Sequence, residues 1–476
     1  MKTQRSLVTG IALFVVLFPL GALTGKAVEL VKDGKAIATV VSSVSREALN
    51  PPASKRGGKR AAAVPEDAEA AAVRLLVDWI KKITDAELPV RTAPVEGAPS
   101  IYVGKAAIQA GLKLDDIQSP SREGVRIVAD DKRVLIAGQN APATLKAVCR
   151  FLEELGCRYF MEGPLGEVYP RTETLNVGRL TITEKPALLS RNPKGPSWRD
   201  SLWKAWNGDG GETIHHQHAW GSYVRPELFA DHPDWFAMGA DGQRKAGGWL
   251  CTSNPGLRKF FAERVIATID GGTRHPSLSP TDGRGYCQCQ ACKAQDDPKS
   301  IEPSSGTVSV SNRYVDFFDD VARRVAAVHP DSILSFYCYA DYTQAPTVTR
   351  KLSPNLCGVI APIRYCRSHG IGDPGCPSRT QQAAMIEGWA AVASRLGYYN
   401  YMYNLADATL PSFKFTSSKQ EFSFLKDKGL TVMTIEVLSN WHIYGPQIYL
   451  SLRLAYDPTA DADALMEDYW QKFYGP

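Results

Sequence analysis

The run Ser277-Leu-Ser-Pro-Thr-Asp-Gly-Arg-Gly-Tyr-Cys-Gln-Cys-Gln-Ala-Cys292 is the most informative stretch of this chain. A short apolar and hydroxyl-bearing segment reaches Pro280, Asp282 follows it, and glycines then turn the chain. This order is typical of a buried strand that ends in a stiff loop, the position at which α/β barrels carry catalytic carboxylates. The alternative interpretation is a loop aspartate that caps the following turn.

From about Leu188 onwards the sequence alternates between strand-like and helix-like runs. We expect strands at 276–279, 333–339, 358–363, 398–403 and 431–436, and helices at 256–270, 308–328, 381–396, 419–428 and 447–456. Strands that alternate with helices predict a parallel sheet, and their number favours an α/β fold of the TIM-like (β/α)8 barrel type. A doubly wound sheet is the alternative, although the sequence has no Gly-rich phosphate turn.

The preceding residues predict a smaller domain. Strand-like runs are found at 28–31, 36–41, 100–103, 124–129, 133–137 and 158–160, and helix-like runs at 68–84 and 141–155. This order predicts an α+β sandwich accessory domain over residues 28–185, with helices on one face, before a barrel domain over residues 186–476. The chain stops just after a helix expected at 461–473, and either the protein is compact to that point or a C-terminal helical region is missing.

Composition and the amino terminus limit the class of protein. Apolar content of 44%, charged content of 22% and a net charge of +5, without a basic stripe interleaved with aromatics, argue against a nucleic-acid partner.

A basic start, an apolar run and small residues ending at Ala27 predict a signal peptide over residues 1–27, and hence a secreted or periplasmic protein. An uncleaved anchor is the alternative. No later stretch predicts stable membrane insertion, and the oligomeric state stays unknown.

Several motifs resemble those of known families. Leu155–Phe160 and Leu165–Pro170 resemble the end of the accessory domain that precedes the barrel in α-glucuronidases and β-hexosaminidases. His232–Phe236, the run at 277–292 and Leu454–Pro458 resemble a family of exported bacterial proteins known as domain of unknown function 4838. This resemblance implies a barrel of glycoside-hydrolase type.

The sequence departs from the hexosaminidases at one position. Those that use the acetamido group of their substrate carry an Asp-Glu pair after the fourth strand, whereas Gly283 follows Asp282 here. That mechanism is therefore not transferred to this chain, and no catalytic motif of the α-glucuronidases is transferred either.

Three carboxylates are candidates for catalysis. Glycoside hydrolysis usually needs one carboxyl group that protonates the leaving oxygen and a second that attacks or activates water. Asp282, Asp341 and Glu436 each follow an apolar strand, and we expect Asp282 and Glu436 to form the catalytic pair, with Asp341 as the next candidate. For Glu436 the alternative is a structural carboxylate paired to arginine or to a backbone N–H. No cofactor is required for this chemistry.

Other side chains near the expected strand ends are candidates for substrate binding. The aromatic candidates, which either stack on sugar rings or pack in the core, are Trp220, Tyr399, Tyr403 and Trp441. Arg364 can grip the carboxylate of a uronic acid, or it forms an ordinary ion pair. In the run His215-His-Gln-His218 we expect His216 and His218 to hydrogen-bond the substrate, with metal binding as the alternative.

The cysteine cluster has its own chemistry. Cys287, Cys289 and Cys292 have the spacing to share one tetrahedral ion, which predicts a structural zinc with Cys251 or Cys366 as the fourth ligand. Disulfides, for which export would be permissive, are the equal alternative. Free thiols are the third interpretation.

The sequence as a whole predicts an exported glycoside hydrolase-like protein that cleaves glycosidic bonds in poly- or oligosaccharides, with uronic-acid-containing substrates among the candidates. Its partner is then a carbohydrate. The first alternative is a non-catalytic carbohydrate-binding barrel that has lost one acid, and the second is a secreted scaffold without a sugar site. Two carboxylates from separate strands around one aromatic site would favour the hydrolase.

Overall fold

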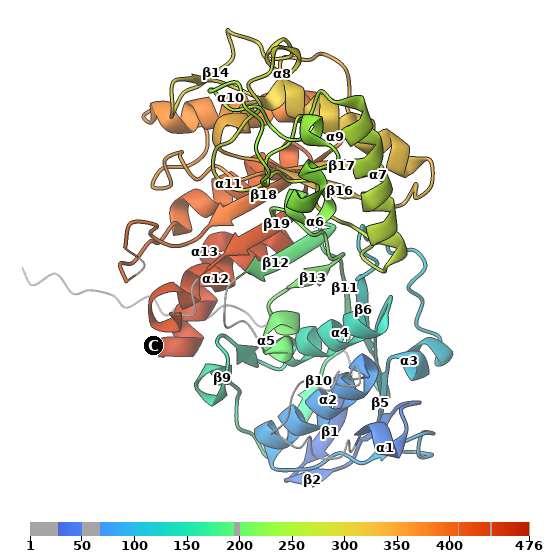
Figure 1. The fold of residues 1–476 in the computed structure, drawn as a ribbon. Helices are drawn as coiled ribbons and strands as arrows, with labels where there is room; N and C mark the ends of the chain where they lie inside the picture. The colour runs from blue at the N-terminus through green and yellow to red at the C-terminus, as the bar shows by residue number, and fades with distance from the viewer. Residues whose placement is uncertain (1–26, 50–66, 195–199, 408, 438–439, 476) are drawn as a thin grey trace, which may run out of the picture.

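The structure is a computed structural model that describes residues 27–49, 67–194, 200–407, 409–437 and 440–475. The predicted signal peptide lies outside the described residues except for Ala27. Two large sheets dominate the described chain, one built from the amino-terminal third and the other from the remainder (Figure 1).

The amino-terminal sheet has six strands in the order β11-β6-β7-β5-β3-β4. Their bounds are β3 (Thr39–Val41), β4 (Val90–Arg91), β5 (Ser100–Val103), β6 (Val125–Ala129), β7 (Arg133–Gly138) and β11 (Leu180–Glu184). Helices α2 (Ala68–Thr84) and α4 (Ala141–Glu154) pack on it, close to the predicted ranges. Asp67 and Asn140 cap these two helices by accepting backbone hydrogen bonds.

This sheet is covered on both faces, which corrects the expectation of helices on one face. Alternate residues of β7 point to opposite sides: Val134 belongs to the main core, whereas Leu135 belongs to a second apolar cluster. The short helix α3 (Lys105–Gln109) and the apolar residues Leu112 and Leu114 complete that second cluster. The helix is short enough that its apolar period is weak in the sequence.

The second sheet has the order β13-β12-β19-β18-β17-β16. The strands are β12 (Ser190–Lys194), β13 (Gly210–Gly211), β16 (Leu334–Cys338), β17 (Leu356–Ile360), β18 (Arg395–Tyr401) and β19 (Leu430–Glu436). All neighbouring pairs from β12 through β19 to β16 are parallel, and only β13 is antiparallel. The prediction of a mixed α/β fold with a parallel sheet is confirmed.

Helices that lie between the strands or follow the last one surround this sheet (Figure 1). They are α7 (Pro255–Asp270), α9 (Ser311–Ala326), α10 (Pro377–Val392), α11 (Phe415–Asp427), α12 (Trp441–Tyr456) and α13 (Ala462–Tyr469). Each overlaps a predicted helix, with ends displaced by a few residues. None of the described helices has the length and apolar character needed to cross a bilayer.

Two irregular segments continue the sheet beyond β16. The predicted strand at 276–279 forms a single parallel bridge, Ser277 to Ser335, and the Leu278 N–H donates to the Ser335 carbonyl at 2.7 Å. The segment 214–219, which follows β13, in turn bonds to it, since the Ala219 N–H donates to the Ser279 carbonyl at 3.0 Å. Pro276 and Pro280 lack N–H groups, which explains why no longer strand forms here.

A buried ion cluster joins the two sheets. Glu123, just before β6, accepts hydrogen bonds from Lys146 of α4 and, at 2.5 Å, from Arg191 of β12, whose side chain is 0% exposed. Burial alone would raise the pKa of Glu123, but the charges of Lys146 and Arg191 lower it to about 2. Two further ion pairs, Arg158–Asp468 and Arg453–Glu153, connect the amino-terminal region to the last helices. The division into domains at residues 185 and 186 stays a prediction.

Candidate active site

The carboxyl ends of the parallel strands meet at one edge of the second sheet. Strand pairing sets Glu436 beside Lys194 of β12 and beside Tyr401 of β18. Residues paired across parallel strands point to the same face, so these three side chains form one row. The preceding row on that face consists of Asn192, Tyr399 and Thr434.

An aromatic group lies over this edge, and we define it as the strand-end cluster: His216, His218, Tyr337, Tyr339 and Tyr399. The ring centres of His218 and Tyr337 are 5.3 Å apart, and those of Tyr337 and Tyr399 are 6.0 Å apart. Tyr339 lies 6.2 Å from Tyr337. The cluster therefore brings together side chains from three segments that are far apart in the sequence.

Glu436 lies at one side of the strand-end cluster and is half-buried. It accepts hydrogen bonds from the phenols of Tyr399 and Tyr403. Burial raises the pKa of Tyr399, and the charge of Glu436 raises it further, so the phenol stays protonated and donates. The Lys194 ammonium lies 5.1 Å from the centre of the Tyr399 ring. Glu436 is thus an oriented carboxylate at the end of a parallel strand.

Asp282 approaches the same cluster from the loop after residues 275–279. Its side chain is 66% exposed, and one carboxylate oxygen lies 3.6 Å from Nε2 of His218. Burial raises the pKa of Tyr337 and Tyr339, and the charges of both Asp282 and Glu436 raise these pKa values further. Asp282 thus borders the cluster at His218, whose ring centre lies 5.3 Å from that of Tyr337, whereas Glu436 borders it from β19.

His216 is held by hydrogen bonds at both ring nitrogens. Its Nδ1 lies 2.9 Å from the carbonyl of Ile214, and its Nε2 lies 2.7 Å from the hydroxyl of Thr434. Burial lowers the pKa of His216 to about 4. The imidazole is therefore neutral near pH 7, and its nitrogens are engaged inside the protein.

Because His216 is neutral in the folded protein, acidification should lower the free energy of unfolding. The pKa of His216 is about 4 in the folded protein and 6.5 as a free group, so its stabilisation is complete at pH values above about 6.5 and is lost as the pH falls towards 4. The loss is about 3 kcal/mol. Denaturant unfolding at pH 7 and pH 4.5 should show a smaller acid-induced loss in His216→Gln than in the wild type. Equal losses in both proteins would argue against a neutral His216, and exposed His215→Gln is the control.

Asp341 and Arg364, both predicted site residues, are partners of each other. Asp341 is buried and accepts hydrogen bonds from Arg364 at 3.0 Å, from Arg284 at 3.1 Å and from Ser305 at 3.1 Å. Burial alone would raise the pKa of Asp341, but the hydrogen bonds from Arg364 and Ser305 and the charge of Arg284 lower it. This arrangement suits a structural carboxylate better than a proton donor.

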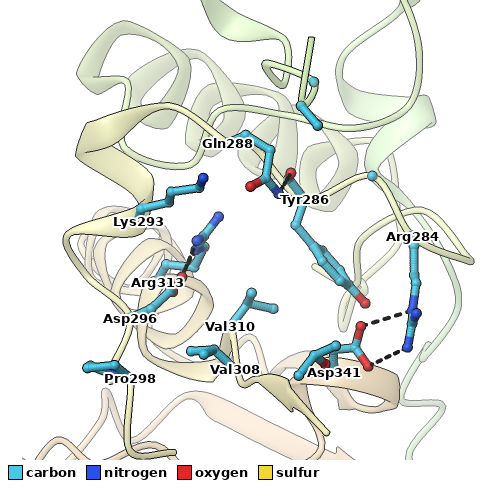
Figure 2. Close-up of a pocket in the computed structure, with 14 residues that line it drawn as sticks. Arg284, Tyr286, Gln288, Lys293, Asp296, Pro298, Val308, Val310, Arg313 and Asp341 are labelled. Carbon is cyan, nitrogen blue, oxygen red and sulfur yellow. Dashed lines mark hydrogen bonds and ion pairs between the residues drawn. The ribbon is translucent and has the colours of Figure 1, made fainter. Parts of the chain in front are cut away.

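A pocket of about 700 Å³ adjoins this ion pair (Figure 2). The loop at 284–288 forms one wall, and Lys293, Asp296 and Arg313 lie across from it. Figure 2 shows the Arg284–Asp341 and Arg313–Asp296 pairs on opposite sides of the pocket. With three basic and two acidic lining side chains, the pocket has a net positive charge, which favours an anionic group.

Of the other aromatic residues predicted to bind substrate, one lies in the core and one lies beside Glu436. Trp220 is 0% exposed, its indole N–H donates to the Leu278 carbonyl at 2.8 Å, and its ring packs against Tyr314. It fills the core beneath the sheet edge, so the expectation that it walls a sugar site is wrong. Tyr403 lies beside Glu436. Trp441 begins α12, and its side chain is outside the described residues.

Several residues at the site were not predicted from the sequence. Lys194 belongs to a strand with a polar sequence, and Tyr337 and Tyr339 belong to a run whose apolar pattern predicts only a strand. The two-residue spacing of these tyrosines places them on one face and was the available signal.

The structure places Cys251, and not Cys366, beside the three clustered cysteines. The sulfur of Cys251 joins those of Cys287, Cys289 and Cys292, and all four lie within 4.8 Å of one another. Cys366 instead lies 3.3 Å from His369 in a separate group.

Comparisons with known proteins give one family and several distant structures. The family model described as Domain of unknown function (DUF4838) matches residues 161–476. No curated protein sequence matches the chain. A family GH115 4-O-methyl-α-glucuronidase with specificity for decorated arabinogalactans is 13% identical, with a TM-score of 0.49. The match covers 94% of this chain but 60% of the glucuronidase chain.

A second group of solved structures is also similar. A mutant β-hexosaminidase of Streptomyces plicatus in complex with GlcNAc is 12% identical, with a TM-score of 0.45, and the match covers 95% of this chain and 93% of the other. The GH20 β-N-acetylhexosaminidase from Streptomyces coelicolor is 14% identical, with a TM-score of 0.46 and a coverage of 94% of each chain.

Proposed function

This chain belongs to the family described as Domain of unknown function (DUF4838), and we propose that it is a glycoside hydrolase whose active site is the strand-end cluster. The observation that carries the proposal is that both carboxylates border the strand-end cluster: Asp282 lies 3.6 Å from His218, and Glu436 lies one row beyond Tyr399 on the same face of the sheet. Two carboxyl groups from separate segments beside aromatic rings are the parts that glycosidic hydrolysis needs.

The pairing of the strands supports a TIM-like barrel for this region. β12, the first strand of the second sheet, pairs in parallel with β19, the last one. The irregular segments at 275–279 and 214–219 continue the sheet from β16 back towards β13. In a barrel the carboxyl ends of the strands surround one mouth, where catalytic residues are found. The strand-end cluster then lies at that mouth.

The environments of the two carboxylates suggest different roles. The phenols of Tyr399 and Tyr403 hydrogen-bond the carboxylate of Glu436 and orient it. Glu436 is the residue that attacks the anomeric carbon or activates water. Asp282 is exposed beside His218 and protonates the leaving oxygen. The ring of Tyr339, which is half-buried, packs against the CH face of the sugar.

The pocket next to Asp341 suggests an acidic substrate. Arg284 follows Asp282 by two residues, and Asp341 follows Tyr339 by two residues, so the pocket is contiguous in sequence with the site. Its net positive lining suits the carboxylate of a uronic acid. A substrate of this kind would place its acidic sugar in the pocket and its scissile bond at the strand-end cluster.

Turnover of a glycoside panel tests the proposed function. The purified protein is incubated with aryl glycosides and with acidic and neutral oligosaccharides, and released sugar is quantified by chromatography. Hydrolysis is expected, with acidic substrates preferred. If the protein binds sugars but does not hydrolyse them, it is a carbohydrate-binding protein and not a hydrolase. If it neither binds nor hydrolyses any sugar of the panel, both functions are contradicted.

Export is proposed on the sequence of residues 1–27. The intact mass of protein isolated from its host should correspond to a chain that begins after Ala27. A full-length chain in the cytoplasm would contradict this.

A further inference from the structure

We propose that Cys251, Cys287, Cys289 and Cys292 bind one structural zinc ion. This site is separate from the strand-end cluster and does not depend on the proposed hydrolase activity. The proposal rests on the distances between the sulfurs, on their burial and on the surrounding hydrogen bonds.

The distances between the sulfurs fit a tetrahedral ion. Zinc lies about 2.3 Å from each thiolate, which places the sulfurs of a regular tetrahedron about 3.8 Å apart. The sulfur of Cys251 lies 3.7 Å from that of Cys289 and 3.8 Å from that of Cys292. A disulfide would bring two sulfurs to about 2.05 Å.

The ligands come from two parts of the chain. Cys251 follows Leu250, which forms an antiparallel bridge to Phe236. The other three belong to the loop after Asp282, and the short helix α8 (Gln290–Lys293) contains Cys292. All four cysteines are buried. An ion held by them would join the 236–251 segment to the loop that carries Asp282.

Few apolar contacts lie immediately around the four sulfurs. The cysteine cluster is separate from the main core, and its partly buried apolar neighbours are Ala237 and Met238. The flanking residues Phe236 and Leu250 pack in the main core instead. The segments around the cysteines are largely without helix or strand, and metal–thiolate bonds stabilise small sites of this kind.

Polar groups around the sulfurs match the needs of thiolates. The Met238 N–H donates to the sulfur of Cys287 at 3.3 Å, and the hydroxyl of Ser253 lies 3.2 Å from the sulfur of Cys292. A guanidinium nitrogen of Arg244 lies 4.0 Å from the sulfur of Cys287. Four thiolates on one divalent ion carry a net charge of −2, and these donors stabilise it.

A second cysteine group provides a matched comparison. Cys366, His369 and Cys376 also have ligand atoms within 4.8 Å of one another, but this group has three members and His369 is exposed. Cys357 of β17 is a buried cysteine outside both groups. Substitutions at Cys366 and Cys376, or at Cys357, should therefore leave the proposed zinc in place.

Metal content tests the proposal. The mature protein is purified without added chelator, and zinc is measured by inductively coupled plasma mass spectrometry. We expect one zinc per chain in the wild type, in Cys357→Ser and in the Cys366→Ser, Cys376→Ser double variant. Cys287→Ser and Cys292→Ser should fall to background. Loss of zinc in the double variant and retention in Cys287→Ser would move the ion to the other group and overturn the proposal.

A second measurement does not depend on the folding of a variant. Wild-type protein in which cobalt replaces zinc should show the absorption bands of a tetrahedral Co²⁺–thiolate centre. A wild-type chain without metal, whose intact mass is lower by two hydrogens for each disulfide formed among these four cysteines, would overturn the proposal. Neither readout uses glycoside turnover.

Discussion

Replacement of Glu436 by glutamine should reduce kcat/KM for glycoside hydrolysis by about 10²–10⁴ without unfolding the protein. The amide has nearly the same shape and keeps an oxygen that accepts from Tyr399 or Tyr403. It cannot attack the anomeric carbon as a carboxylate does, nor take a proton from water. The change therefore removes the chemistry and retains the packing.

Asp282→Asn should cause a loss of the same order, because the amide cannot protonate the leaving oxygen. Glu263→Gln is the matched control, since that carboxylate is 58% exposed on α7 and should leave turnover unchanged. Steady-state kinetics on the best substrate of the panel compares the three variants, with circular dichroism to verify folding. Full activity in Glu436→Gln would remove Glu436 from the catalytic pair.

Glu123→Gln should destabilise the folded protein by about 3–5 kcal/mol. Arg191 is 0% exposed and its guanidinium pairs with Glu123, so the neutral amide leaves a buried positive charge without its counter-ion. Lys146 loses the same partner. Because this cluster joins the two sheets, we expect the unfolding transition of the whole molecule to shift to lower denaturant concentration.

The pH dependence of this variant gives a second readout. The pKa of Glu123 is about 2 in the folded protein and 4.5 as a free group, so its stabilisation is complete above about pH 4.5 and is lost as the pH falls towards 2. The glutamine variant has no such stabilisation to lose, so its free energy of unfolding should decrease less as the pH falls. Glu87→Gln, which breaks an exposed pair with Lys81, should leave the unfolding midpoint in place. Equal midpoints for wild type and Glu123→Gln would contradict the role of the cluster.

The sheet could be predicted wherever its strands are apolar. The runs that became β16, β17, β18 and β19 are buried on both faces, and their sequences show it. β12 was missed because Asn192, Pro193 and Lys194 end it with residues that rarely form a buried strand. Its place in the sheet comes from pairing with β19, a tertiary contact that no local pattern encodes.

The site could be predicted in part. Asp282 and Glu436 can be proposed from the sequence because each follows an apolar run, and their catalytic role stays a prediction. Lys194, Tyr337 and the fourth cysteine, Cys251, lie far away in the sequence, and only the fold brings them to their partners. Trp220 was misplaced because an aromatic residue near a strand end has the same local pattern whether it lines a site or fills the core.

A crystal structure of the Glu436→Gln variant with a bound oligosaccharide tests the central claim most directly. We predict a scissile glycosidic bond between residue 436 and Asp282, with a sugar ring against Tyr339 and the two carboxyl positions within about 10 Å of each other. A sugar bound only elsewhere on the protein, with Asp282 and residue 436 both remote from it, would contradict the account.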